Sequence, residues 1–381
     1  MKISYYILFI AFLICTNGVR SQTINCQSLK MSGITTSPIY YSPENFRSDT
    51  IDILKYTINL DITDFTNQKI KGNTIVRFAP KINTQTKLRL DLLKLQIDSV
   101  KQNTTTLMYN YNDTLLKINL PTALNTTDTS EVTIYYHGTP QGDPSGWGGF
   151  SFSGNYAYNL GVGFGAKPHN YGRVWFPCFD NFVEKSKYEF NITTDTAKRA
   201  YCNGLLTSDV KLGNKRTRQW ILNKEIPSYI ASVAVADYTQ VNWTVNAANG
   251  LLPIVLAARP ADTTALKNGF VHLPNAILGY ENYYGPYVWN RVGYCLVPFN
   301  SGAMEHVTNI AYPQAATAIA YESQLMAHEL SHHWWGDLMT CETQEDMWLN
   351  EGMASYSERL FLEWTYNYAK YLTEVKLIHD D

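Results

Sequence analysis

The sequence contains no run of basic residues, and its 31 basic and 33 acidic residues leave a formal charge of only −2. Nucleic acid is therefore not an expected partner. Cysteine is scarce and widely spaced, with six residues in 381, which is unlike the dense framework of a small disulfide-stapled domain. Apolar residues are abundant, at 45% of the chain, and they can form packed cores in two or three domains.

The N-terminus has the pattern of an export signal. Lys2 precedes an apolar run, Ile3–Cys15, that is shorter than the ~20 residues a membrane-spanning helix needs. Val19-Arg20-Ser21 places small or medium residues at the two positions that a signal peptidase reads. We predict a signal peptide over residues 1–21 and an exported protein, periplasmic or secreted, with no stable membrane span after cleavage. The alternative is an uncleaved membrane anchor.

Removal of the signal peptide would leave five cysteines. This number is odd, so at least one thiol stays unpaired unless it pairs between chains. Export permits disulfides. A Cys178–Cys202 disulfide is one option, and two buried thiols are the other.

The stretch from about residue 51 to 239 has the pattern of β-strands. Apolar Tyr56, Ile58 and Leu60 alternate with polar neighbours, the period of two expected for half-buried strands. This predicts a β-rich, sandwich-like domain after a lead segment at residues 22–50. A glycine-rich stretch at 142–165 contains several aromatic residues but has no flanking helix–strand frame, so we interpret it as a structural loop near a cleft rather than a phosphate loop.

Helical patterns dominate after about residue 300. The stretch from 315 to 335 has neither proline nor glycine and is followed by Gly336, a signal for a helix C-terminus. A second helix is predicted from residue 349 to about 364. The two expected helices carry the residues that point to chemistry.

The first expected helix contains the pattern His328-Glu329-x-x-His332. Helix positions i and i+4 lie on one face, so both imidazoles can bind a single zinc ion. Glu329 points about 100° around the helix, where it can act as general base on a zinc-bound water. Glu351 follows His332 after eighteen residues and completes a three-ligand site. One Zn²⁺ per chain with an open coordination position is predicted.

The alternative for this motif is a helix with two surface histidines. The helical setting and the spaced Asn350-Glu351-Gly352 segment favour the metal site. His333 lies outside the ligand pattern and is expected behind the ligands or at the surface. Trp334 and Trp335 are expected to pack in the core.

Four segments together resemble the aminopeptidase N-like zinc metallopeptidases of the gluzincin group. Residues Met326–Leu338 are similar to the zinc helix of that family, and Trp348–Ala354 to its second-helix signature. Gly302–His306 resembles its Gly-x-Met-Glu-Asn exopeptidase motif. Trp175–Asp180 resembles the Phe-Pro-Cys-x-Asp segment of its β-rich domain. The resemblance runs from about residue 51 to 365.

The resemblance implies an α+β multidomain fold, with a β-rich saddle or sandwich domain at 51–239 and an incomplete thermolysin-like α/β catalytic domain at 240–381. It also implies that Glu305 binds the free α-amino group of a peptide, because a carboxylate fixed near the metal selects an ammonium and sets the scissile bond. Three neighbours are expected to hold the peptide near the zinc: Gly302, Ala303 and Met304. The expected function is the zinc-dependent removal of N-terminal residues from peptides with a free N-terminus.

Three departures from the family pattern bear on this expectation. His306 stands where the family has asparagine, and the segment at 165–168 carries no second amine-binding side chain. The family also has a transition-state tyrosine several tens of residues beyond the third zinc ligand, whereas this chain ends thirty residues beyond Glu351. We therefore expect a fragment or the product of a disrupted gene. The tyrosines that do follow Glu351 are not well placed to replace the transition-state tyrosine: Tyr356, Tyr366, Tyr368 and Tyr371.

Two alternative functions stay open at this point. One is a catalytically impaired or non-catalytic homologue that binds zinc and peptides, which the absent tyrosine favours and the intact zinc motif disfavours. The other is the same zinc chemistry on another substrate, as in an endopeptidase or an epoxide hydrolase. The carboxylate of Glu305 favours the aminopeptidase.

Overall fold

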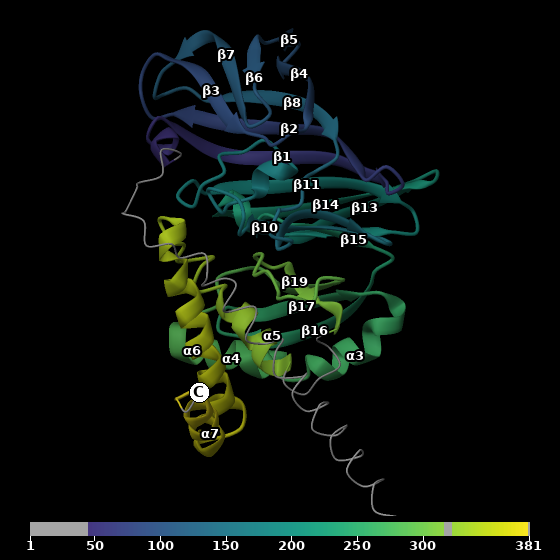
Figure 1. Cartoon of the computed structure of the whole chain (residues 1–381), viewed down its shortest axis with the longest axis vertical. Coiled ribbons are helices and arrows are strands. Elements are labelled where there is room, and N and C mark those ends of the chain that lie inside the picture. Colours follow the sequence, from purple (N-terminus) through teal and green to yellow (C-terminus); the bar gives the residue numbers. More distant parts are fainter. Residues whose placement is uncertain (1–44, 316–321, 380–381) are drawn as a thin grey trace, which may run out of the picture.

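The computed structural model describes residues 45–315 and 322–379 (Figure 1). A β-rich domain forms the upper part of the molecule in this view, and a smaller sheet with helices forms the lower part. The predicted signal peptide and most of the lead segment lie outside the described residues. Among the residues that are described, no helix is both long and apolar enough to cross a membrane.

The β-rich domain is built on an eight-stranded sheet in the order β13-β14-β11-β1-β2-β8-β4-β5. Its strands are β1 (Ile51–Asp64), β2 (Lys69–Pro80), β4 (Gln96–Gln102), β5 (Thr105–Thr106), β8 (Ser130–Gly138), β11 (Ser186–Asp195), β13 (Leu205–Leu212) and β14 (Lys215–Ile226). Neighbours pair antiparallel except β1 and β11, which run parallel. The predicted alternation is confirmed in β1, where Tyr56, Ile58 and Leu60 are buried.

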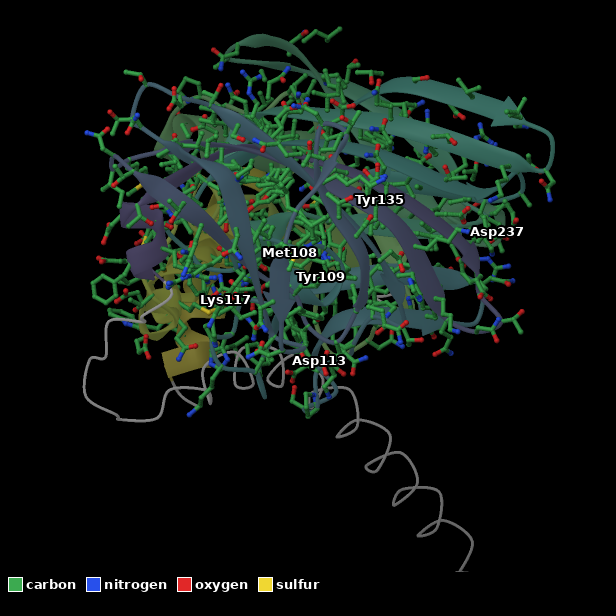
Figure 2. The ribbon with its side chains drawn as sticks, turned by 90° about the horizontal axis from the view of Figure 1, so that it is seen from above. Met108, Tyr109, Asp113, Lys117, Tyr135 and Asp237 are labelled. Atoms are coloured by element: carbon green, nitrogen blue, oxygen red, sulfur yellow. The ribbon has the colours of Figure 1, made fainter. Side chains whose placement is uncertain are left out.

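Two smaller sheets complete this domain. One has the order β3-β7-β6 and consists of β3 (Gln85–Asp91), β7 (Leu115–Leu124) and β6 (Tyr109–Tyr111). Its outer side carries exposed residues such as Met108 and Tyr109 (Figure 2). The other has the order β12-β15-β10-β9 and consists of β12 (Arg199–Cys202), β15 (Val233–Ala236), β10 (Tyr156–Gly163) and β9 (Gly148–Ser153). The glycine-rich stretch thus forms the β9–β10 hairpin and the loops beside it.

The second domain begins with a four-stranded sheet in the order β16-β17-β18-β19. Its strands are β16 (Thr239–Ala247), β17 (Gly250–Ala258), β18 (Val292–Val297) and β19 (Ile310–Pro313). The last three run parallel to one another. The helices are α3 (Thr263–Gly269), α4 (Leu273–Tyr284), α5 (Glu322–Ser331), α6 (Met347–Thr365) and α7 (Tyr368–His379). Single 3₁₀ turns occur at Asn45–Asp49, Gly172–Val174, Ser228–Ile230, Pro260–Asp262 and Gln344–Asp346.

Buried tyrosines set the positions of α5 and α6 relative to the sheet. The hydroxyl of Tyr280 on α4 lies 3.0 Å from the carbonyl oxygens of both Ala327 on α5 and Ser357 on α6. From β18, the hydroxyl of Tyr294 donates to the carbonyl of Met326, at 2.7 Å. These bonds satisfy buried polar groups. Tyr280 connects α5 and α6 through α4, and Tyr294 connects α5 to β18.

The predicted helix at 315–335 is too long at its C-terminal end. Of that range, residues 316–321 lie outside the described part, and α5 ends at Ser331. The amides of His333 and Trp334 bond to carbonyls three residues earlier, which tightens the last turn as helix ends often do. Gly336 then takes a φ of +128°, a conformation that suits glycine. The second predicted helix agrees with α6 to within two residues at each end.

Candidate active site

The two helices bring His328, His332 and Glu351 together. His328 lies in the last turn of α5, and His332 immediately follows it. Their Nε2 atoms are 3.2 Å apart. Glu351, in the first turns of α6, places Oε2 at 3.3 Å from Nε2 of His328 and Oε1 at 3.9 Å from Nε2 of His332. All three side chains are buried.

The second nitrogen of each ligand histidine has its own partner. Nδ1 of His328 lies 2.7 Å from Oε1 of Glu358, two turns after Glu351 on α6. Nδ1 of His332 lies 3.0 Å from the carbonyl oxygen of Trp335. A carbonyl only accepts, so Nδ1 of His332 carries the proton and its Nε2 presents a lone pair toward the cluster. Such partners fix the ring orientation of metal-binding histidines.

The donor set fits a zinc ion. Two nitrogen ligands of one tetrahedral zinc, each at ~2.0–2.1 Å, lie ~3.3 Å apart, and the two Nε2 atoms are separated by 3.2 Å. Two imidazole Nε2 atoms facing each other with a carboxylate beside them form a site for a cation. His328, His332 and Glu351 are the residues that can hold it.

Electrostatics around His328 also favour a cation. Burial lowers the pKa of this imidazole, but the hydrogen bonds with Glu351 and Glu358 outweigh burial and raise the pKa to about 10. The carboxylates that stabilise a proton on this ring stabilise a metal ion at the same place. Glu358 was not among the residues predicted from the sequence. Its spacing of seven residues from Glu351 places both on one face of a helix and could have indicated it.

Glu329 and Glu305 meet beside this cluster. Glu305 belongs to the segment between β18 and β19, and Glu329 lies on α5. One ligand atom from each of Glu305, Glu329 and His332 lies within 4.8 Å of the other two, and all three residues are buried. The structure therefore places the predicted base, Glu329, and the predicted amine-binding carboxylate, Glu305, next to each other and next to His332.

The segment that leads to Glu305 is held by hydrogen bonds from both domains. Met304 forms a bridge with Ala311, in which each amide donates to the other residue's carbonyl at 2.9 Å. Gly302, with a φ of +149°, and Ala303 are buried beside it. The indole Nε1 of Trp147, from the loop before β9, donates to the carbonyl of Ser301 at 3.2 Å. The glycine-rich stretch thus contacts the exopeptidase-like segment from the β-rich domain.

His306 and His333 are both buried, so the surface position considered for His333 is wrong. The amide of Gly161 on β10 donates to Nε2 of His306 at 3.2 Å. The amide of Thr308 donates to Nε2 of His333 at 3.3 Å, and Nδ1 of His333 lies 2.8 Å from the hydroxyl of Tyr287. Burial and the neighbouring His332 lower the pKa of His333 to about 3, so this ring is neutral and structural.

Other residues of the predicted set are placed as follows. Trp334 is buried and its indole donates to the carbonyl of Gly285, whereas Trp335 is half-buried. The amide of Gly165 donates to Asp143 at 2.8 Å, an arrangement internal to the glycine-rich stretch. In the described part of the chain the four cysteines are free and buried, so Cys178 and Cys202 form no disulfide with each other: Cys178, Cys202, Cys295 and Cys341.

A buried cluster of two histidines and a glutamate, with a carboxylate-bearing loop beside it, lies in the domain that follows the β-rich domain. Residues 42–230 match the peptidase M1 N-terminal domain and residues 272–380 match the peptidase family M1 domain, which together cover more than three quarters of the chain. The chain belongs to peptidase family M1.

Named relatives agree with this assignment. Leucine aminopeptidase 2 of Aspergillus fumigatus is 29% identical over 80% of this chain and 50% of its own length. Glutamyl aminopeptidase of Bitis rhinoceros is 31% identical over 49% of this chain and 20% of its own length. The chain thus spans half or less of the length of these curated relatives.

Solved structures share the fold. The M1 zinc metallopeptidase from Deinococcus radiodurans superimposes with a TM-score of 0.74 at 22% identity, covering 84% of this chain and 72% of that one. The similarity supports the arrangement of a β-rich domain followed by a domain with a small sheet and helices.

Proposed function

We propose that this protein is a zinc-dependent aminopeptidase that removes N-terminal residues from peptides. The observation that carries the proposal is the convergence of Glu305 and Glu329 on His332, with ligand atoms within 4.8 Å of one another. A base and an amine-selecting carboxylate are then adjacent to the metal cluster. The relatives named as aminopeptidases support the reaction. A solved M1 structure described as bound to a Tyr-Ser-Ala substrate supports the peptide class.

In this proposal one zinc ion per chain is held by His328, His332 and Glu351. When bound, it polarises the scissile carbonyl and lowers the pKa of water. Glu329 takes a proton from the attacking water and delivers it to the leaving amine. Glu329 has no exposed surface, and exclusion of water around the base protects this transfer from side reactions.

Glu305 binds the α-ammonium of the substrate. A charge-assisted hydrogen bond to a fixed carboxylate is stronger than a neutral one, and it sets the register so that the first peptide bond reaches the base. Three glutamates, Glu305, Glu329 and Glu351, are gathered in one buried region. Their negative charge favours a cationic partner, such as a metal ion or an ammonium group.

Hydrolysis of an aminoacyl arylamide tests the proposal. The zinc-loaded protein is compared with Glu329→Gln, and we expect the variant to lose 10²-fold or more of kcat because the general base is gone, while zinc content stays the same. Glu345→Gln, an exposed carboxylate beside α6, is the matched control and should retain the parent rate. Equal rates for Glu329→Gln and the parent would refute the catalytic assignment. Equal turnover of N-acetylated substrates would instead favour an endopeptidase.

We also propose that the protein is exported and that residues 1–21 are removed. The apolar run and the small or medium residues Val19 and Ser21 support this. N-terminal sequencing of the protein secreted by its host checks the cleavage site, and retention of residue 1 would contradict it.

A further inference from the structure

The β-rich domain holds the loop that carries Glu305. This loop, residues 304–309 and hereafter the Glu305 loop, forms hydrogen bonds with several residues of that domain. Gly161 donates to His306, as described above. The side-chain amide of Asn309 donates to the carbonyl of Tyr201 at 3.2 Å and to the hydroxyl of Ser232 at 2.8 Å. All of these groups are buried, so water does not compete for the bonds.

Asn203 bonds both to the β-rich domain and to the Glu305 loop through one side-chain amide. It follows β12 and has no exposed surface. Its Nδ2 donates to the carbonyl of Ile230 at 2.9 Å and to the carbonyl of Val307 in the Glu305 loop at 2.6 Å. Its Oδ1 accepts from the amide of Ser232 at 2.6 Å and from the Ser232 hydroxyl at 3.3 Å. The full capacity of the amide is used, and one of its four bonds crosses to the catalytic domain.

The next residue extends the contact toward the zinc helix. The amide of Gly204 donates to Oγ1 of Thr308 at 2.7 Å. Thr308 has a φ of +58°, an unfavourable conformation for a β-branched residue, so it persists only because its surroundings hold it. Its own amide donates to His333, the neighbour of the ligand His332. Asn203 and Gly204 therefore bond to the Glu305 loop, and through Thr308 the loop bonds to His333, just after the end of α5.

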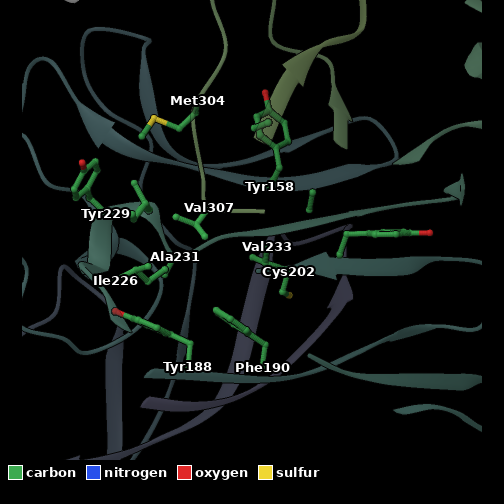
Figure 3. Packing of buried hydrophobic residues seen from close by; sticks show 14 of the residues in the cluster. Tyr158, Tyr188, Phe190, Cys202, Ile226, Tyr229, Ala231, Val233, Met304 and Val307 are labelled. Atoms are coloured by element: carbon green, nitrogen blue, oxygen red, sulfur yellow. The ribbon is translucent and has the colours of Figure 1, made fainter. Parts of the chain in front are cut away.

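Packing supports the same connection. Figure 3 shows Met304 and Val307 among buried residues of the β-rich domain, including Ala231, Val233 and Tyr229. Glu305 lies between these two anchored positions. A side chain on such a segment has its position set by the neighbours on each side.

We infer that Asn203 is a positioning residue for Glu305, so that the β-rich domain takes part in selecting a free N-terminus. This inference rests on the proposed function, because it assigns a support to the amine-binding carboxylate. Misplacement of a binding group by about 1 Å can cost 10²-fold in rate. Loss of the Asn203 bond to Val307 should therefore weaken recognition of the ammonium more than it weakens the metal site, whose ligands lie on α5 and α6.

Asn159 provides a matched control. It is also buried, on β10, and its side chain bonds only within the β-rich domain: Nδ2 donates to the carbonyl of Ala231 at 3.0 Å and Oδ1 accepts from the amide of Val233 at 2.8 Å. Truncation of either asparagine leaves buried backbone groups unpaired and lowers stability. Of the two asparagines, Asn203 is the one that bonds to the Glu305 loop.

The experiment measures binding of leucine hydroxamate and of its N-acetyl form to the zinc-loaded full chain by calorimetry. The ratio of the two dissociation constants reports selection of the free amine. We expect Asn203→Ala to reduce this ratio at least 10-fold with zinc affinity unchanged, and Asn159→Ala to leave the ratio at the parent value. Thr308→Ala, which removes the acceptor for Gly204, should reduce the ratio in the same direction and serves if Asn203→Ala does not fold.

Two outcomes would overturn the inference, and they differ. If the parent prefers the free amine and both Asn203→Ala and Thr308→Ala keep the full ratio, the β-rich domain does not position Glu305, and the proposed function stands. If the parent itself binds both hydroxamates equally, amine selection by Glu305 is refuted, and the inference falls with it.

Discussion

At the scale of single residues, the proposed zinc site depends on a side chain and a backbone carbonyl that support its candidate ligands from behind. Both ligand histidines present Nε2 to the cluster because Nδ1 is bonded elsewhere, in one case to Glu358 and in the other to the carbonyl of Trp335. A carboxylate partner raises the basicity of an imidazole ligand as well as orienting it. The affinity of the site for zinc is thus shared between the ligands and their supports.

The change Glu358→Gln tests this point. We expect zinc to bind about 10- to 100-fold more weakly, because a neutral amide orients His328 without raising its basicity. Competition against a chromogenic chelator measures the dissociation constant. Glu363→Gln, a half-buried carboxylate further along α6, is the control and should bind zinc as the parent does. Unchanged affinity in Glu358→Gln would show that the 2.7 Å contact is not important for the metal.

At the scale of elements, spacing along a helix was predictable and the ends of the helix were not. The candidate zinc ligands follow from two histidines four positions apart at the C-terminal end of α5 and one glutamate on the next helix, a local geometry that the sequence specifies. The end of α5 at Ser331 depends on His333, which turns inward to bond Tyr287 and Thr308. The sequence of the helix does not indicate that His333 will bond to Tyr287 and Thr308.

Contacts between residues far apart in the sequence leave no local pattern, which explains why the residues that support the site were not predicted. Asn203 is far from Glu305 in the sequence and contacts its loop only through the packing of two domains. Tyr229, whose hydroxyl lies 3.4 Å from the carbonyl of Gly336, is another long-range neighbour. The β-rich character and its alternation could be predicted because they are periodic, whereas the pairing order of eight strands could not, since β1 joins β11 across a large part of the domain.

Strand β10 has a position where no side chain fits. A Cβ on Gly161 would lie 1.4 Å from the carbonyl oxygen of Tyr229, whereas a Cβ on Gly142 would meet nothing within 4 Å. We expect Gly161→Ala to destabilise the fold by about 1–3 kcal/mol or more, because backbone must shift to relieve the overlap. Urea unfolding followed by tryptophan fluorescence measures this. Gly142→Ala should stay within about 0.5 kcal/mol, and a similar value for Gly161→Ala would contradict the packing.

At the scale of the whole molecule, the metal cluster joins two helices that are otherwise held by packing and tyrosine hydrogen bonds. A ligand that binds only the folded state stabilises it, by about 2.7 kcal/mol when present at 100 times its dissociation constant. We expect zinc to raise the Tm of the chelator-treated protein by several degrees. Differential scanning calorimetry measures the shift. His328→Ala should lose most of it, and an equal shift in that variant would place zinc elsewhere.

The central position of β1 has a consequence for how the chain is made. This fourteen-residue strand is the first of the eight-stranded sheet to leave the ribosome, and β2 covers one of its edges almost at once. The other edge waits for β11, which begins more than 120 residues after β1 ends. Until then the nascent domain displays a long unpaired strand edge, the kind of surface that recruits other chains. Folding of the β-rich domain therefore waits until its later strands have been synthesised, and it is governed by contacts between distant parts of the sequence.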